Sequence, residues 1–192
     1  RALAKHQGEL KRSIVIVAFD GEESGLIGSG EFIKQNIVEA TDIKLMMSID
    51  MIGRYKESNS LIMGAMGTLT DGEDLLDEIA KKHDIKIKRT GTEVSNRTDS
   101  KPFGDIGIPA LHVTSGITGP YHKPADDRET IDYKGMEKIS GLLYELTFVL
   151  ANQESLEPSV KFIADKERIG VPIFRVGAKV NIGRSFHAYP ND

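Results

Sequence analysis

The most informative stretch of this chain is Ile14-Val15-Ile16-Val17-Ala18-Phe19-Asp20-Gly21-Glu22-Glu23-Ser24-Gly25-Leu26. Its first half is rich in Ile and Val, which predicts a strand over Ser13–Phe19 that is buried on both faces. Glu22 and Glu23 follow at the carboxyl end of this run. In open α/β sheets that edge carries ligands and catalytic groups. The two carboxylates are therefore candidate site residues, although glutamate is also favoured at helix N-termini by the helix dipole.

The rest of the chain alternates strand-like segments with amphipathic helical ones. Apolar residues recur at helical spacing in three segments, and short β-rich runs lie between them. We expect helices over residues 25–36, 72–83 and 133–151, and strands over residues 43–51, 60–63, 85–88 and 109–114. This alternation predicts an α/β fold, a three-layer α/β/α sandwich around a mostly parallel, mixed central sheet.

Composition places the chain among globular proteins and argues against several functions. Its 192 residues, 39% hydrophobic and 28% charged, suffice for one domain with a sizeable core. A net charge of −4 argues against a nucleic-acid partner, which would require a broad basic surface. No apolar run reaches the roughly 20 residues that a membrane-spanning helix needs. Cysteine is absent, which excludes disulfides, thiolate metal sites and cysteine nucleophiles.

Two further polar residues follow predicted strands. Asp50 interrupts an otherwise apolar run, and a buried carboxylate is costly unless it is paired or binds a cation. His122 lies in a turn between Pro120 and Pro124, where it can present one ring nitrogen to a metal. The alternatives are a capping or salt-bridged aspartate and a histidine without a ligand role. The other histidines lack an acid partner at ligand spacing and are interpreted as structural or exposed: His6, His83, His112 and His187.

Taken together, these residues have the composition of a hydrolytic metal site. Glu23, Asp50 and His122 follow three different predicted strands, and two carboxylates with one imidazole suit zinc or a similar divalent ion. Glu22 is then a carboxylate beside the metal that does not coordinate it. Such a carboxylate can accept the proton of a metal-activated water and deliver it to the leaving amine.

Four motifs resemble a known family. The runs FDGEESGLIGS, SIDMIGR, RTDSKPF and YHKPADDRETID, in this order, resemble the M28 zinc aminopeptidases over about residues 1–152. The resemblance implies a zinc-exopeptidase-like fold and a two-zinc site that removes residues from free peptide N-termini. Carried over by position, it makes Glu22 the general base, Glu23 and His122 ligands of the first metal, and Asp50 a ligand of the second.

The chain also departs from the family pattern. The family's first metal histidine and its bridging aspartate belong to a segment upstream of Arg1, with the N-terminal strands of the sheet, and no His-x-Asp pair occurs here. We therefore expect an incomplete site that binds zinc weakly in the isolated chain. Ser100 follows Asp99 where many relatives have histidine. Asp99, Ser100 and Tyr121 are candidate substrate-binding residues, although Tyr121 can equally pack against the His122 loop.

The remaining expectations concern organisation and context. Residues 1–152 are expected to form a partial catalytic domain, and residues 153–192 a linker followed by a β-rich extension of unknown role. The pattern over residues 173–182 predicts a hairpin, the start of a small appended domain or an extra strand of the sheet, and the sequence does not separate these. The resemblance implies a peptide substrate and an extracytoplasmic location. Substrate side-chain preference, oligomeric state and native metal are left open by the sequence.

Two other functions stay open. One is a glutaminyl-cyclase-like acyltransferase, which needs a single zinc that Glu23, Asp50 and His122 could bind nearly unaided. The other is a receptor-like ectodomain that kept the fold and lost the activity. The longer motif matches favour the peptidase, and buried acids without cations have no physical reason to persist in a silent site.

Overall fold

The computed structural model describes residues 2–6, 8–117 and 119–169 of the chain. The α-helices are α1 (Ile27–Lys34), α2 (Tyr55–Ser58), α3 (Gly72–Lys82), α4 (Ser100–Asp105), α5 (Tyr133–Asn152) and α6 (Val160–Arg168). The strands are β1 (Met46–Ile49), β2 (Leu61–Gly64), β3 (Ile87–Arg89) and β4 (Ala110–Thr114). The short 3-10 helices are η1 (Leu3–His6), η2 (Met66–Thr68) and η3 (Arg128–Thr130).

The described strands form one mixed sheet in the order β1-β4-β2-β3. β1 runs parallel to β4, with Met46 opposite Ala110, and β2 runs parallel to β3. The central pairing of β2 with β4 is antiparallel, with Met63 opposite Val113. The predicted mixed, mostly parallel sheet is therefore confirmed.

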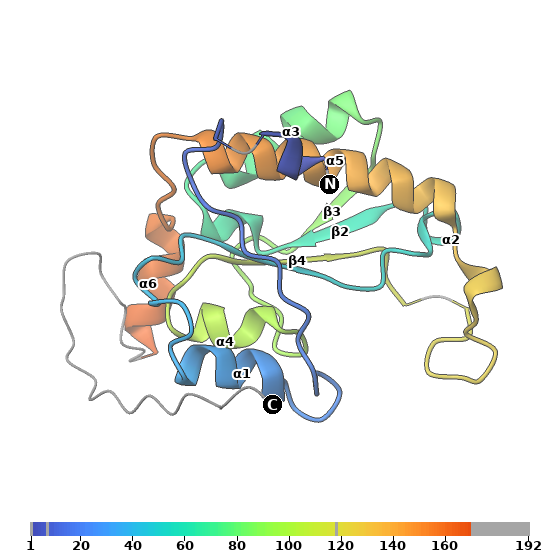
Figure 1. The fold of residues 1–192 in the computed structure, drawn as a ribbon, viewed down its shortest axis with the longest axis horizontal. Coiled ribbons are helices and arrows are strands. Elements are labelled where there is room, and N and C mark those ends of the chain that lie inside the picture. The colour runs from blue at the N-terminus through green and yellow to red at the C-terminus, as the bar shows by residue number, and fades with distance from the viewer. Residues whose placement is uncertain (1, 7, 118, 170–192) are drawn as a thin grey trace.

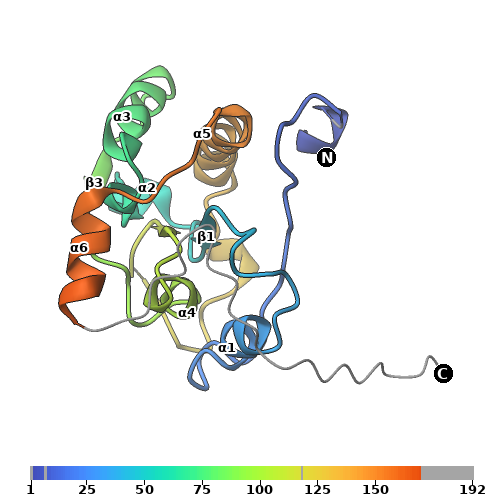
Figure 2. The same ribbon diagram turned by 90° about the vertical axis from the view of Figure 1, so that its left-hand side faces the viewer.

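Helices cover both faces of this sheet (Figures 1 and 2). α3 and α5 lie on one face, and α1 and α4 lie on the other. Side chains of β4 alternate between these layers, as the twofold repeat of a strand requires: Leu111 and Val113 join the α3/α5 core, whereas Ala110 joins the α1/α4 core. The three-layer α/β/α fold predicted from the sequence is confirmed.

The long helix α5 shows why the sequence folds this way. Its buried side chains recur at intervals of three and four residues, which places them on one stripe facing the sheet: Ile139, Leu142, Leu143, Leu146 and Leu150. Asp132 caps its N-terminus by accepting a hydrogen bond from the Gly135 N–H at 3.0 Å. The same carboxylate accepts from the Lys56 N–H at 2.8 Å, which fixes α5 against the start of α2.

One sequence prediction is wrong. Residues 13–19 are not a buried strand, because no backbone hydrogen bond joins them to a neighbouring strand within the described part of the chain. Ile16 is 89% exposed and Val15 is 62% exposed. The end of the run is anchored, since the Phe19 ring packs against Phe32 and Phe103 of the α1/α4 core. Apolar composition predicts that a segment prefers burial, but a strand also needs a hydrogen-bonded neighbour.

Residues beyond α5 pack onto the domain as far as they are described. Phe162 of α6 is fully buried, and the Ser159 hydroxyl donates to the Gly67 carbonyl at 2.6 Å. Leu69 and Pro158 form an isolated antiparallel bridge. The β-rich pattern over residues 173–182 lies outside the described residues, and the domain boundary at residue 152 stays a prediction. Among the helices that the structure describes, none has the length and apolar character to cross a membrane.

Candidate functional site

Two of the predicted site residues follow strands that end at the same edge of the sheet. β1 and β4 are parallel neighbours, so the segments after them leave the sheet side by side. Asp50 comes directly after β1, and its N–H donates to the Val113 carbonyl at 3.0 Å. His122 lies in the loop that follows β4. The topology therefore places the starts of these two segments at the same edge of the sheet.

Glu22 and Glu23 lie in a tight turn that leads into α1. The Leu26 N–H donates to the Glu22 carbonyl at 2.9 Å, and the Gly28 N–H donates to the Asp20 carbonyl at 2.9 Å. Only glycine fits at position 28, because a Cβ atom there would lie 2.6 Å from the Asp20 oxygen and 2.8 Å from its nitrogen. This close approach fixes the turn that presents both carboxylates.

The structure brings Glu23 and His122 into direct contact. The Nε2 atom of His122 lies 2.8 Å from the Oε1 atom of Glu23, and both side chains are exposed. The Tyr121 ring stacks on the His122 ring with centroids 3.8 Å apart and planes inclined by 22°. The packing alternative for Tyr121 is therefore observed, and its role toward substrate stays a prediction. His122 itself has a left-handed backbone with φ of 56°, which is unusual for a residue other than glycine.

Glu22 lies among negative charges. Its pKa is raised above the ordinary value, first by burial and then by the charges of Glu23, Asp50 and Asp99, while His122 acts in the opposite direction. A carboxylate with a raised pKa accepts a proton more readily, which is the property required of a general base.

The predicted donors fit a zinc ion only in part. A carboxylate oxygen and an imidazole nitrogen are typical zinc ligands, and the contact of Glu23 with His122 places one of each at the same point. Catalytic zinc sites use three protein ligands. Within the described ranges, no group of three or more His, Cys, Asp or Glu side chains could hold a metal ion, so Asp50 does not complete the set.

Asp99 and Ser100 lie at the start of α4. Ser100 is completely buried, and its hydroxyl forms a 2.7 Å hydrogen bond with the Thr98 hydroxyl. The Oδ1 atom of Asp99 is buried and has no hydrogen-bond partner among the described residues. Asp99 is thus placed to influence Glu22 by its charge, while the Ser100 hydroxyl is engaged within the protein. Their substrate-binding roles stay predictions.

Two residues were not among the predicted site residues: His112, which was interpreted as structural or exposed, and Arg54, which the sequence analysis did not single out. His112 of β4 is largely buried, its Nδ1 atom has no partner among the described residues, and its pKa is lowered by burial, while the charge of Asp50 opposes the shift. Arg54 ends the SIDMIGR motif and binds the loop that carries His122.

His6 and His83, in contrast, lie away from the site and contact Glu9 and Glu145. His187 lies outside the described residues. No sequence signal distinguished His112, because its alternating β pattern is that of any strand residue.

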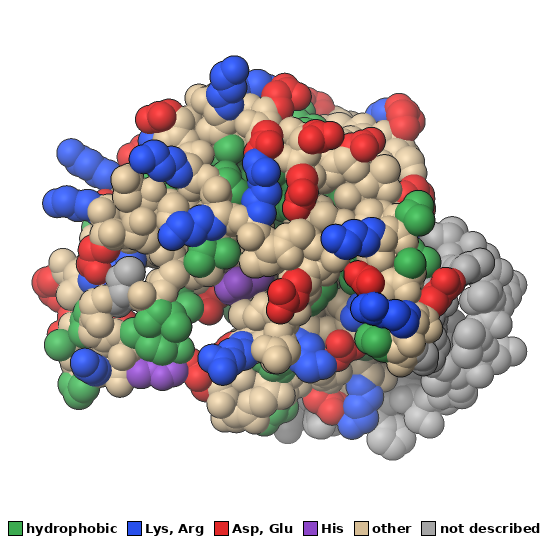
Figure 3. All heavy atoms as spheres, turned by 180° about the vertical axis from the view of Figure 1, so that it is seen from behind, with side chains coloured by type: hydrophobic (Ala, Val, Ile, Leu, Met, Phe, Trp, Pro, Cys, Tyr) green, Lys and Arg blue, Asp and Glu red, His purple; other side chains and the backbone are tan. Residues whose placement is uncertain are grey.

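The surface opposite to the view of Figure 1 is hollowed and mixed in charge. Figure 3 shows histidine side chains beside a hollow, with acidic side chains next to them and basic side chains distributed among the acidic ones. A mixed surface of this kind gives no extended patch of one charge.

Comparison with known proteins agrees with the motifs. The model of peptidase family M28 matches residues 1–147. A probable leucine aminopeptidase of Arthroderma benhamiae is 28% identical over 156 residues, which are 73% of this chain and 41% of that protein. The chain therefore spans about two fifths of the length of this curated relative.

Solved structures show the same fold. A zinc aminopeptidase from Bacillus subtilis, BSAP, superimposes with a TM-score of 0.60 at 19% identity, covering 72% of this chain and 36% of that one. The LapA aminopeptidase of Legionella pneumophila gives a TM-score of 0.59 at 19% identity, covering 71% of this chain and 38% of that one. At these identities the likeness supports the fold.

Proposed function

Because the chain belongs to peptidase family M28, we propose that it contributes the general base and part of the metal site of a zinc-dependent aminopeptidase. The observation that carries this proposal is the contact between Glu23 and His122 beside Glu22. These residues come from the turn before α1 and from the loop after β4. A carboxylate and an imidazole meeting at an exposed edge, with a second carboxylate of raised pKa next to them, suit metal-assisted hydrolysis.

Glu22 is the proposed general base. A bound zinc ion would polarise the scissile carbonyl and lower the pKa of water at the site. Glu22 would accept a proton from the attacking water and then deliver it to the leaving amine. The acids around Glu22 favour its protonated form, so the transfer to this carboxylate is not opposed by its surroundings.

Glu23 and His122 are the proposed ligands of one zinc ion, and Asp50 is the proposed ligand of a second. Because no three-donor group forms in the described part of the chain, we propose that the isolated chain binds zinc weakly and has little activity. The two-ion site belongs to the complete catalytic domain. An extracytoplasmic location is also proposed, and it rests on the family alone.

Substrate assays test this function. The full-length gene product should release the first residue from aminoacyl p-nitroanilides, and N-acetylated forms of the same substrates should be inert, since aminopeptidases require a free amine. Hydrolysis of the blocked substrates would contradict the aminopeptidase. Conversion of N-terminal glutamine to pyroglutamate without hydrolysis would favour the cyclase. No reaction with either class, in protein with a full complement of zinc, would favour the receptor-like ectodomain.

A further inference from the structure

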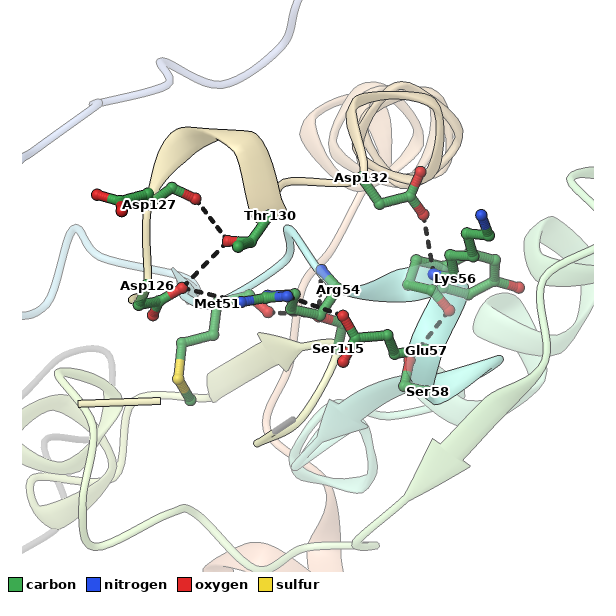
Figure 4. A network of polar contacts seen from close by, with 11 residues as sticks. Met51, Arg54, Lys56, Glu57, Ser58, Ser115, Asp126, Asp127, Thr130 and Asp132 are labelled. Atoms are coloured by element: carbon green, nitrogen blue, oxygen red, sulfur yellow. Dashed lines mark hydrogen bonds and ion pairs between the residues drawn. The ribbon is translucent and has the colours of Figure 1, made fainter. Parts of the chain in front are cut away.

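Arg54 occupies a well-defined position between two segments of the site. Its side chain is only 13% exposed, although it carries a charge. One guanidinium nitrogen, Nη1, donates to the Glu57 carboxylate at 2.8 Å, and the other, Nη2, donates to the Asp126 carboxylate at 3.0 Å (Figure 4). A guanidinium cannot be deprotonated in a protein, so a largely buried one must find acceptors. Arg54 finds one in its own α2 segment and one in the His122 loop.

The loop touches the guanidinium at two points, on either side of His122. Gly119 lies next to it, since a Cβ atom placed there would be 3.2 Å from Nη1 and 3.3 Å from Cζ. Asp126 accepts from Arg54 and also from the Thr130 hydroxyl at 3.4 Å. Arg54 therefore bridges the beginning and the end of the loop segment that contains Tyr121 and His122.

The backbone of Arg54 is fixed as firmly as its side chain. Its N–H donates to the Ser115 hydroxyl at 3.1 Å, and that hydroxyl donates to the Met51 carbonyl at 2.6 Å (Figure 4). The Ser115 N–H donates to the same carbonyl at 3.1 Å. The segment that follows Asp50 is thus joined to the first residue after β4, and Arg54 extends from this junction to the loop.

His122 requires such external support. Its left-handed backbone, with φ of 56°, costs about 1–2 kcal/mol for a residue other than glycine. Its side chain is exposed, and its described side-chain contacts are the Glu23 carboxylate and the Tyr121 ring. Residues in sparsely populated conformations persist where the surrounding structure over-determines them. The loop can supply that constraint only if its two ends are held.

We propose that Arg54 is a positioning residue: by binding Asp126 and lying next to Gly119 it keeps the loop in the conformation that points His122 at Glu23. This inference deepens the proposed function, because His122 is a ligand there. Exposed ion pairs contribute about 0–1 kcal/mol and are often dispensable. Arg54 differs in being largely buried, in binding two carboxylates and in lying close to the backbone of Gly119.

The chain provides a matched pair of variants for the test. Asp126→Ala and Glu57→Ala each remove one carboxylate from the same guanidinium, but only Asp126 belongs to the His122 loop. Arg54→Lys keeps the charge and loses the planar fork that binds both carboxylates. Asp126 and Glu57 are both substantially exposed, so these two variants are expected to fold.

The first readout needs no metal. In the metal-free chain, nuclear magnetic resonance should show an Overhauser contact between the His122 ring and the Glu23 side chain. We expect this contact to be lost in Asp126→Ala and Arg54→Lys, with faster amide exchange at Lys123 and Asp126, whose N–H groups bond within the loop. Glu57→Ala should retain the contact. Retention of the contact in Asp126→Ala, or equal loss in Glu57→Ala, would overturn the proposal.

The second readout separates this inference from the proposed function. Zinc affinity should fall about 10–100-fold in Asp126→Ala and Arg54→Lys, the usual effect of losing a residue that orients a ligand, and should be unchanged in Glu57→Ala. Suppose that Asp126→Ala loses the ring contact but keeps its zinc affinity, whereas His122→Ala loses zinc affinity. The positioning role of Arg54 is then wrong. If His122→Ala also leaves zinc affinity unchanged, the proposed function fails, and the ring contact alone decides whether Arg54 positions His122.

Discussion

The Nε2 atom of His122 lies 2.8 Å from the Oε1 atom of Glu23, although 99 positions separate these residues along the chain. His122→Ala should therefore lower zinc affinity by at least about tenfold, since even residues that only orient a ligand have effects of this size. Competition with a chromophoric chelator measures the affinity. His83→Ala is the control, because His83 contacts Glu145 at the same 2.8 Å on the α3/α5 side of the molecule. Equal losses in the two variants would show that the Glu23 contact has no special role.

Two glycines at the start of α1 should respond oppositely to alanine. Gly28→Ala should destabilise the chain by about 1–3 kcal/mol, because its methyl group meets the backbone of Asp20 rather than a movable side chain. Gly30→Ala should stabilise it by about 0.5–1 kcal/mol, since nothing lies within 4 Å of a Cβ atom there and alanine favours the helix. Urea unfolding of both variants measures the difference. A tolerated Gly28→Ala would mean that the turn carrying Glu22 and Glu23 is looser than described.

Helical periodicity was the most reliable guide to the fold. The expected helix over residues 133–151 matches α5. Its apolar residues recur every three or four positions, and only a helix places residues of that spacing on one face. The Ser13–Phe19 run failed for a different reason. Its Ile and Val residues specify a preference for burial and extension, but they do not specify the neighbouring strand to which the backbone must bond.

The candidate site was predictable in its residue types more than in its geometry. Acids and a histidine after predicted strands indicated Glu23 and His122, and the structure brings them together. Asp50 was grouped with them, yet no three-donor group forms in the described residues. Arg54 could not be found, because its hydrogen bond to Asp126 joins residues 72 positions apart, and no local pattern encodes such a contact.

The exposed Ile16 offers a direct test of the corrected strand. Ile16→Lys should change the free energy of unfolding of the chain by no more than about 0.5 kcal/mol, the usual range for surface substitutions. In a strand buried on both faces, an unpaired lysine would instead cost several kcal/mol. Chemical denaturation of the variant distinguishes these cases, and a large loss of stability would restore the original prediction.

His112 should make the metal-free chain sensitive to acid. Its pKa in the folded state is lowered by burial from the ordinary value of 6.5, so below that pH the unfolded chain takes up a proton that the folded chain resists. Stability should therefore be unaffected by this group above about pH 6.5 and fall as the pH decreases below it. His112→Gln, which cannot be protonated, should lose less stability in urea titrations between neutral and acidic pH. An equal acid loss in the two proteins would contradict the prediction.

The most direct test of the account compares the full-length gene product with its Glu22→Gln variant, measuring zinc content and hydrolysis of an aminoacyl p-nitroanilide in the same samples. We predict that the variant retains its zinc while kcat falls by about 10²–10⁴-fold, the contribution of a general base. Unchanged turnover in the variant would contradict the role of Glu22. Loss of zinc together with activity would instead make Glu22 a ligand.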